Sequence, residues 1–331
     1  MHRGIFNVGN TCYFNTAMQC LLHTNSLSSF LKDGLNRVNL VDTPLFHSLC
    51  IFYKSLVESS SEAIDPRFLL QNIVSKFNDR MELREQNDIQ EFIVMFIDEL
   101  NKEISGHVPE ESFSELRAIR HDKKSSNIQK FKAFADIQWL SSHKREYSVL
   151  VPMLYGQQVN QLMCNKCKSF NHIFENFVSI EISFPDSYNP SEPKCIKEMI
   201  ETTLLDEDVS SRECDECNQN ASAIKSHKFW RLPRILMVFI KRFNSSMRKI
   251  NYPIQVDHTM QIECLTSRKQ DNNYQLTAIG CHQGGMHSGH YYALCKGNDS
   301  WYLYDDDHAE KIQSIEKYPP QAYYVLIYEN V

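Results

Sequence analysis

The sequence lacks a long hydrophobic run and any excess of positive charge. No stretch of about 18 apolar residues occurs in the 331-residue chain, and its start, MHRGIFNVGN, lacks the apolar segment of a signal peptide. The net charge of −6 gives no general attraction for a phosphate backbone. We therefore expect a soluble intracellular protein of the cytoplasm or nucleus, with neither nucleic acid nor a membrane as its partner.

Wholesale disorder is also excluded, because hydrophobic residues make up 42% and charged residues 23% of the chain, as in ordinary globular proteins. The length is near that at which one core divides into lobes. Eleven cysteines are an odd number, so they cannot all pair. Four of them form two CxxC pairs. Six others are scattered singly and are expected to be small buried residues: Cys20, Cys50, Cys195, Cys264, Cys281 and Cys295.

Residues 10 to 104 have the periodicity of amphipathic helices, with apolar residues three and four positions apart. Thr43-Pro44 is a start signal for one helix, and Asp65-Pro66 is a start signal for a second. A third helix is expected from Gln86 on. The apolar positions that these helices should bury are Leu49, Phe52, Tyr53 and Leu56; Leu69, Leu70, Ile73 and Phe77; and Ile89, Phe92, Ile93, Phe96, Ile97 and Leu100.

Residues 105 to 135 lose this periodicity, so this part is predicted to be a connecting loop. After Val149 the pattern changes to that of strands. Val178–Phe184 alternates apolar and polar residues, as in a half-buried strand. The apolar runs Ile235–Ile240 and Tyr323–Tyr328 are typical of central strands that are buried on both faces. A helical half followed by a β half predicts an α+β fold.

Cys12 lies at the predicted start of a helix, directly after a Gly9-Asn10 turn in the segment GIFNVGNTCYFNTAMQCLL. Free backbone N–H groups and the positive end of the helix favour a thiolate over a thiol. The same N–H groups, with the side-chain amide of Asn7, could donate hydrogen bonds to an oxyanion. Cys12 is therefore a candidate nucleophile, although most cysteines at helix starts are structural. The helix is expected to bury Phe14, Met18, Leu21 and Leu22.

His290 is the candidate base. A histidine can accept a thiol proton near pH 7 and return it to a leaving amine. His290 begins the apolar run Tyr291–Leu294, which predicts a rigid strand. His282 and His287 lie in a glycine-rich stretch that is expected to be mobile.

Two aspartates follow at a spacing that suits an orienting carboxylate. A turn at residues 297–299 would fold the strand Trp301–Tyr304 back beside the strand of His290 and bring Asp305 and Asp306 towards the imidazole. A carboxylate there fixes the tautomer and stabilises the imidazolium, which completes a Cys/His/Asp arrangement. The alternative is a solvated acidic turn at Asp305–Asp307.

Five features in this order resemble the ubiquitin-specific proteases, a papain-like family of cysteine deubiquitinases. GIFNVGNTCYFNTAMQCL resembles the Cys box, QNDIQEF the acidic-helix motif, LPRILMVFIKRF the strand before the His box, and GHYYAL with WYLYDDD the His box. The two CxxC pairs fall where the family has zinc-bearing fingers. The resemblance covers nearly the whole chain and implies hydrolysis of the isopeptide or peptide bond after the C-terminal glycine of ubiquitin.

The resemblance implies a role for each residue of the catalytic set. Cys12 would be the nucleophile and His290 the general base. Asp305 would be the third member of the triad. Asn7 would donate to the oxyanion, and Asp306 would assist through water or through His290.

Four further positions are implied to bind the substrate. Asp88 and Gln90 would grip the extended tail of ubiquitin, while Gly289 and Tyr291 would flank a narrow channel for its terminal glycines. Only glycine passes such a channel, because a side chain next to the scissile bond would collide with its walls. The sequence departs from the family pattern at Asn87, where a second Gln or a His is common.

The resemblance also implies the architecture. It predicts a papain-like catalytic domain over residues 1–331, with a helical thumb at 1–110, the connecting loop at 111–135 and a β palm at 136–331 that carries zinc-type β fingers at about 155–235. Because only residues 1–3 precede the Cys box, no further N-terminal domain is expected. A monomer is predicted, and its implied partners are ubiquitin and ubiquitin-conjugated proteins.

The CxxC pairs are Cys164 with Cys167 and Cys214 with Cys217. Two such pairs suit a tetrahedral site of four thiolates, which is closed to substrate and therefore structural. We predict a structural zinc ion there and no catalytic cofactor. The alternatives are two disulfides, or a finger that has lost its metal.

Three other functions fit part of the sequence. A protease for another ubiquitin-like modifier would use the same site, because a Gly-Gly tail does not identify the body that precedes it. A non-catalytic ubiquitin-binding scaffold often lacks one of Cys12, His290 and Asp305. A zinc-binding interaction module would need only the fingers and would leave the Cys and His boxes unexplained.

Overall fold

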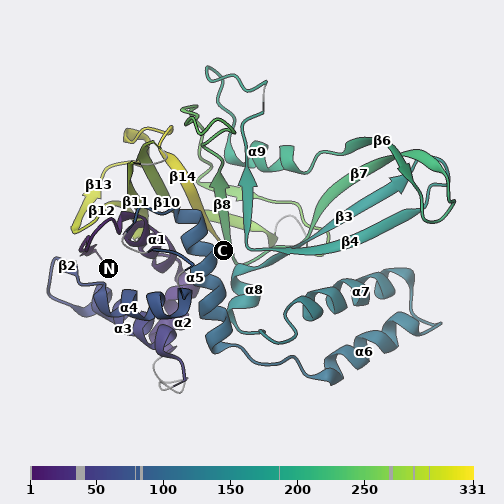
Figure 1. Cartoon of the computed structure of the whole chain (residues 1–331), viewed down its shortest axis with the longest axis horizontal. Helices are drawn as coiled ribbons and strands as arrows, with labels where there is room; N and C mark the ends of the chain where they lie inside the picture. The colour runs from purple at the N-terminus through teal and green to yellow at the C-terminus, as the bar shows by residue number, and fades with distance from the viewer. Residues whose placement is uncertain are drawn as a thin grey trace.

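The protein combines a helical lobe with a central β-sheet and a second sheet that projects away from both (Figure 1). The computed structural model describes residues 2–34, 42–78, 80–82, 85–185, 187–267, 271–285, 288–297 and 299–331. In these ranges, no helix has both the length and the apolar character needed to cross a membrane. The predicted α+β class is confirmed by this mixture of a helical half and a β half.

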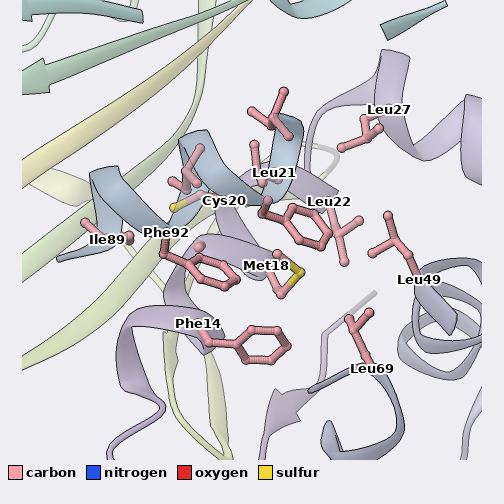
Figure 2. Packing of buried hydrophobic residues seen from close by; sticks show 14 of the residues in the cluster. Phe14, Met18, Cys20, Leu21, Leu22, Leu27, Leu49, Leu69, Ile89 and Phe92 are labelled. Carbon is pink, nitrogen blue, oxygen red and sulfur yellow. The ribbon is translucent and has the colours of Figure 1, made fainter. Parts of the chain in front are cut away.

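The helical lobe is built around α1 (Cys12–Leu22), in which every residue is buried. The helices around it are α2 (Asn25–Gly34), α3 (Pro44–Glu58), α4 (Arg67–Phe77) and α5 (Ile89–Ile104). The apolar faces predicted for α1, α3, α4 and α5 are all buried. Figure 2 shows Phe14, Met18 and Phe92 packed together where α1 and α5 meet. A short parallel pair, β1 (Gly4–Ile5) with β2 (Ala63–Ile64), ties the start of the chain to this lobe.

The central sheet has eight strands in the order β13, β12, β11, β10, β14, β8 and β5, with β9 paired to β10. Their bounds are β5 Ser179–Ile182, β8 Ile235–Ile240, β9 Thr259–Gln261, β10 Asn273–Gly284, β11 Gly289–Gly297, β12 Ser300–Asp305, β13 His308–Ile312 and β14 Tyr323–Asn330. As predicted, β8 and β14 lie inside the sheet, and all six residues of β8 are buried.

Both faces of this sheet are covered, which explains why β8 is apolar at every position. Met237 and Phe239 join the core of the helical lobe, while Leu236 and Val238 face a second core that includes α9 (Ile196–Thr203). The helix α1 packs against β10 and β11. The helix that begins at Cys12 is thereby held against the strand that carries His290.

The projecting sheet has four antiparallel strands in the order β4, β3, β7, β6. Their bounds are β3 Gly156–Cys164, β4 Phe170–Phe177, β6 Glu207–Glu213 and β7 Asn220–Arg231. Its own core is small and consists of Ala135, Val159, Phe174 and Trp230. The strand β6 is almost entirely exposed. The sheet lies in the region predicted to form fingers, and the exact limits of thumb, palm and fingers stay predictions.

The prediction of a connecting loop at 111–135 is wrong. This part contains most of α6 (Glu110–His121) and the first half of α7 (Asn127–Ser142), which is followed by the short α8 (Leu150–Leu154). A capping box between Ser126 and Gln129 begins α7. The two helices were not predicted because their sequences lack a clear apolar stripe. The helix α6 buries only Phe113. The helix α7 packs its aromatic residues against the projecting sheet.

Candidate active site

Cys12 is the first residue of α1 and is 6% exposed. The preceding loop is held by Asn7, whose Oδ1 accepts hydrogen bonds from the backbone N–H of Gly9 and of Thr11, both at 3.1 Å. Gly9 and Asn10 have positive φ values of 115° and 52°, which a tight turn requires. The turn therefore ends where the helix begins, and the thiol is placed at the end of the helix with free N–H groups.

His290 and Asp305 come together in the hairpin of β11 and β12, as the turn after β11 predicted. His290 Nε2 lies 2.5 Å from Asp305 Oδ1. The Cys12 side chain lies close enough to His290 to raise the pKa of the imidazole. With Nε2 engaged by Asp305, Nδ1 is the ring nitrogen that can exchange a proton with sulfur. Three residues from distant parts of the chain thus form one connected series. Part of the turn, Asn298, lies outside the described residues.

The protonation of His290 is controlled mainly by the carboxylate of Asp305. The hydrogen bond with Asp305, and next the Cys12 side chain, raise the pKa of His290 to about 10, while burial opposes them. At neutral pH the imidazolium is favoured, so a positive charge lies beside the Cys12 sulfur. This is the environment in which a thiol reacts as a thiolate.

Asp306 binds the Cys-box loop. Within the described residues its hydrogen bonds go to this loop and to α1, and not to His290. Its Oδ2 accepts from Asn7 Nδ2 at 2.9 Å, and its Oδ1 accepts from Asn15 Nδ2 at 2.7 Å. Its carbonyl oxygen accepts from the N–H of Ile5 at 2.7 Å. Asp306 therefore fastens the end of β12 to the segment that carries Cys12.

Two polar residues of the site were missed from the sequence. Asn15 is buried on α1 and also donates to the carbonyl of Ile5 at 3.1 Å. Asn15 is one of three polar residues on the predicted helix, with Thr16 and Gln19, and its position three residues after Cys12 could have identified it. Gln86 accepts a hydrogen bond from the N–H of Gly289 at 3.1 Å, and its place at the start of the acidic-helix motif is the only sequence feature that points to it.

One cleft, of about 450 Å³, contains Cys12 and all four residues predicted to bind the substrate, Asp88, Gln90, Gly289 and Tyr291. It lies between the start of α1, the segment before α5, the end of β8 and the β10–β11 hairpin. The helical lobe supplies one wall and the central sheet the other. The cleft therefore lies between two walls that share one hydrophobic core below it, and an extended chain can enter it to reach the thiol.

Asp88 and Gln90 already have partners within the chain. Asp88 Oδ1 caps α5 by accepting from the N–H of Gln90 at 2.7 Å, and its Oδ2 accepts from the Tyr324 hydroxyl at 2.5 Å. Gln90 Nε2 donates to Glu181 at 2.6 Å, and Lys241 pairs with the same carboxylate at 2.6 Å. Both side chains are thus held at fixed positions along the cleft.

Gly289 has no room for a side chain. A Cβ atom there would lie 2.2 Å from His282 Nε2 and 2.8 Å from the carbonyl oxygen of Gln283.

The expectation that His282 lies in a mobile stretch is wrong, because His282 belongs to β10 and is 4% exposed. Its strand β10 is paired with β11 on one side and with β14 on the other. The glycines that follow in the sequence had indicated a loop instead. His287 lies outside the described residues.

The two CxxC pairs meet at the far end of the projecting sheet. Each pair lies in a turn with the same backbone: the N–H of Lys168 donates to the carbonyl of Cys164 at 2.9 Å, and that of Asn218 donates to the carbonyl of Cys214 at 2.8 Å. The four sulfurs lie within 4.8 Å of one another, with Cys167 Sγ 3.7 Å from Cys214 Sγ. A tetrahedral zinc ion with Zn–S bonds of about 2.3 Å would have its sulfurs about 3.8 Å apart. This four-cysteine group can therefore hold a metal ion.

All eleven cysteines are free thiols, so the CxxC pairs form no disulfides. Ser169 lies beside the four-cysteine group, with its Oγ 3.0 Å from Cys167 Sγ and 3.5 Å from Cys214 Sγ. The Ser169 hydroxyl and nearby backbone N–H groups lower the pKa of Cys214 to about 6. Hydrogen bonds to a sulfur in this way favour the thiolate that a metal requires.

A cysteine at a helix start, beside a strand-borne His–Asp pair in a cleft between a helical lobe and a sheet, is the architecture of papain-like thiol hydrolases. Residues 3–328 match the family model described as ubiquitin carboxyl-terminal hydrolase. The chain belongs to the ubiquitin carboxyl-terminal hydrolase family.

Individual relatives agree with this assignment. Ubiquitin carboxyl-terminal hydrolase Usp2 of Drosophila melanogaster is 26% identical over an alignment of 337 positions, gaps included, that covers 99% of this chain and 34% of that protein. Ubiquitin carboxyl-terminal hydrolase 21 of Mus musculus is 26% identical over an alignment of 356 positions that covers 99% of this chain and 61% of that protein. The chain thus spans only part of the length of these relatives.

A solved structure shares the fold. The SAGA Ubp8/Sgf11/Sus1/Sgf73 DUB module bound to ubiquitin aldehyde matches with a TM-score of 0.73 at 21% identity, over 99% of this chain and 69% of that chain. At that identity the match shows the fold. It is the papain-like fold predicted from the sequence.

Proposed function

We propose that this chain is a deubiquitinating cysteine protease that hydrolyses the isopeptide or peptide bond after the C-terminal glycine of ubiquitin. The observation that carries the proposal is the series Cys12, His290 and Asp305 beside a cleft whose wall at Gly289 is packed too closely for that residue to carry a side chain of its own. Family membership supports ubiquitin as the substrate class.

In the first step the Cys12 sulfur attacks the carbonyl carbon of the terminal glycine, and the thiol proton resides on His290. The C–S bond forms as the carbonyl oxygen becomes an oxyanion. His290 then gives its proton to the leaving amine while the C–N bond breaks, which leaves a thioester on Cys12. Asp305 keeps the ring oriented through Nε2 during both proton transfers.

In the second step water attacks the thioester. His290 takes one proton from the water as the new C–O bond forms, and the Cys12 sulfur leaves as a thiolate. The glycine end leaves as a carboxylic acid and gives its remaining proton to solvent, which yields the carboxylate, and the starting enzyme is restored with one proton on His290.

Asn7 would stabilise the oxyanion together with the N–H groups at the start of α1. One of its two amide hydrogens is directed to Asp306, which leaves the second as a donor. We assign Asp306 a positioning role for this amide. Asp88, Gln90, Gly289 and Tyr291 are assigned to the tail, because all four line the cleft that leads to Cys12.

We also propose that the four-cysteine group holds a zinc ion, which would join the ends of strand pairs that have almost no apolar core of their own. A zinc bound by four thiolates is closed to substrate and therefore structural. Elemental analysis of purified protein should find about one zinc per chain, and protein free of metal would overturn this assignment.

An intracellular location and a monomeric state complete the proposal. Eleven free thiols suit a reducing compartment. Light scattering of the purified chain should give a mass near 38.7 kDa. A mass of twice that value would contradict the monomer.

The test of function compares substrates that share a Gly-Gly end. Purified chain is incubated with ubiquitin carrying a C-terminal fluorogenic amide, and with another ubiquitin-like modifier carrying the same group. We expect at least about tenfold higher kcat/KM for ubiquitin, since recognition of the body adds to that of the tail. Preference for the other modifier would support the alternative protease. Tight binding of ubiquitin without turnover would support a non-catalytic scaffold.

A further inference from the structure

A lysine and a histidine that have no role in the chemistry described above meet beside the cleft, and the histidine is part of its lining. Lys249 follows β8, and its Nζ lies 3.1 Å from His282 Nδ1 and 2.6 Å from the carbonyl oxygen of His282. His282 is 4% exposed. One ammonium group therefore holds both the ring and the backbone of the histidine.

This contact determines where the imidazole carries its proton. An ammonium group has three N–H donors and no acceptor, so Nδ1 must accept and the proton of the neutral ring must be on Nε2. Burial, and next the charges of Lys249 and His290, lower the pKa of His282 to about 4. The ring is therefore neutral at pH 7, unlike the imidazole of His290.

The Nε2 end of this ring lies beside Gly289. A Cβ atom on Gly289 would approach Nε2 to 2.2 Å, and the ring of Tyr291 lies 4.5 Å away, centroid to centroid. His282, Gly289 and Cys12 line the same cleft. Within the described part of the chain, the hydrogen bonds of the His282 ring are confined to Nδ1.

We propose that Lys249 is a positioning residue that fixes His282 as a neutral imidazole with its proton on Nε2, and that this N–H donates to a backbone carbonyl of the glycine-ended tail. The inference rests on the proposed function, because it requires an extended tail in the cleft. A tail carbonyl loses its water on entry and needs a donor in exchange. A neutral donor supplies it without a second positive charge beside His290.

Several ionisable groups face this pair from neighbouring elements, and they set the pH range of the test. Burial raises the pKa of the Tyr291 and Tyr324 hydroxyls, so both stay neutral. Burial and the charge of Arg242 lower the pKa of Lys249 to about 8. Among the described residues, the facing groups are Arg242 and Cys281 beside Lys249, and His290, Tyr291 and Tyr324 beside His282. At pH 7 and below, the charged form of Lys249 is therefore favoured.

Nitrogen NMR of protein labelled at histidine tests the tautomer directly, with His282→Gln used to assign the signal. We expect the Nε2–H tautomer in the unmodified protein, with no titration between pH 5.5 and 7.5. A ring that carries its proton on Nδ1, or that is cationic at pH 7, would overturn the proposal. This measurement does not depend on the folding of any Lys249 variant.

The second measurement is hydrolysis of ubiquitin with a C-terminal fluorogenic amide by Lys249→Met and Lys249→Arg. Loss of one positioned hydrogen bond should raise KM by about 3- to 10-fold in Lys249→Met, with kcat within about twofold. The pKa of His282 should rise in this variant, and Lys249→Arg should keep the tautomer and restore part of the affinity. An unchanged KM together with an unchanged His282 signal in Lys249→Met would refute the positioning role.

The proposed function and the role of Lys249 are tested by different outcomes. Absence of turnover by the unmodified protein would remove the proposed function itself. Normal turnover by the unmodified protein, with Lys249→Met identical to it in KM and in the NMR signal, would remove only the role of Lys249.

Discussion

The cleft and the tip of the projecting sheet position their sulfur atoms in different ways. Cys12 begins a helix whose residues are all buried, and hydrogen bonds from β1, β12 and α1 itself fasten it to the sheet. Of the four clustered cysteines only Cys164 is buried, and β6, the strand before the second CxxC pair, is almost entirely exposed. Where burial is available, packing fixes the geometry. Where it is not, a bound metal ion is the remaining means of fixing it.

The largest effect on turnover should come from the carboxylate that orients the base. Asp305→Asn removes the main cause of the raised pKa of His290, so the imidazolium is lost at neutral pH and the ring can adopt the wrong tautomer. We expect kcat to fall by about 10³- to 10⁴-fold. Steady-state kinetics with a ubiquitin amide measures this. The control is Asp307→Asn, an exposed neighbour in the same turn that should retain activity.

The same interaction has a pH dependence of known sign. The pKa of His290 is raised to about 10 in the folded protein, above its ordinary value near 6.5. Its contribution to folding stability is therefore fully present below pH 6.5 and is lost as the pH rises through about 10. Thermal unfolding of the unmodified protein should show this loss between pH 7 and 10, and Asp305→Asn should show less of it.

The next effect should come from the glycine of the cleft wall. Gly289→Ala forces a methyl group against His282 and shifts the neighbouring His290, so kcat/KM should fall by about 10²-fold. Gly285→Ala is the matched control, since it lines the same cleft and an added Cβ there meets no atom within 4 Å. Equal losses in both variants would mean that the crowding around Gly289 does not set the width of the channel.

A smaller effect on turnover is expected at the other end of the molecule. Cys214→Ser removes one ligand of the four-cysteine group, so the tip of the projecting sheet should become sensitive to proteolysis. We expect KM for ubiquitin to rise, with kcat within about threefold, because the cleft is packed independently. Cys264→Ser, outside the group, is the control. A collapse of kcat in Cys214→Ser would show that the two regions are coupled.

The smallest effect on turnover should come from the core of the helical lobe, although its effect on stability is large. Phe92 is completely buried between α1 and α4, and Phe92→Ala should lower the free energy of unfolding by about 3–5 kcal/mol. The fraction that remains folded should keep nearly normal turnover. Ile173→Ala on the projecting sheet, which is 56% exposed, should change stability by less than about 0.5 kcal/mol. Denaturant titration separates the two variants.

The elements around the cleft could be predicted from the sequence more completely than those near the projecting sheet, because more of their residues are buried. Buried helices and strands leave apolar stripes, so α1, α3, α5, β8 and the hairpin of His290 could be predicted. The helix α6 buries one residue and leaves no stripe, so it was predicted to be a loop. Contacts such as Asp306 with Asn15, or Lys249 with His282, join residues far apart in sequence. No periodicity records such pairs.

The central claim is that the Cys12 sulfur is the group that attacks the end of ubiquitin. It is tested most directly by incubating the protein with ubiquitin that carries a C-terminal electrophile, followed by intact mass and peptide mapping. We expect the mass of the unmodified protein to increase by one ubiquitin, attached to Cys12, and the mass of Cys12→Ala to stay unchanged. An adduct that persists in Cys12→Ala, or one that maps to another cysteine, would contradict it.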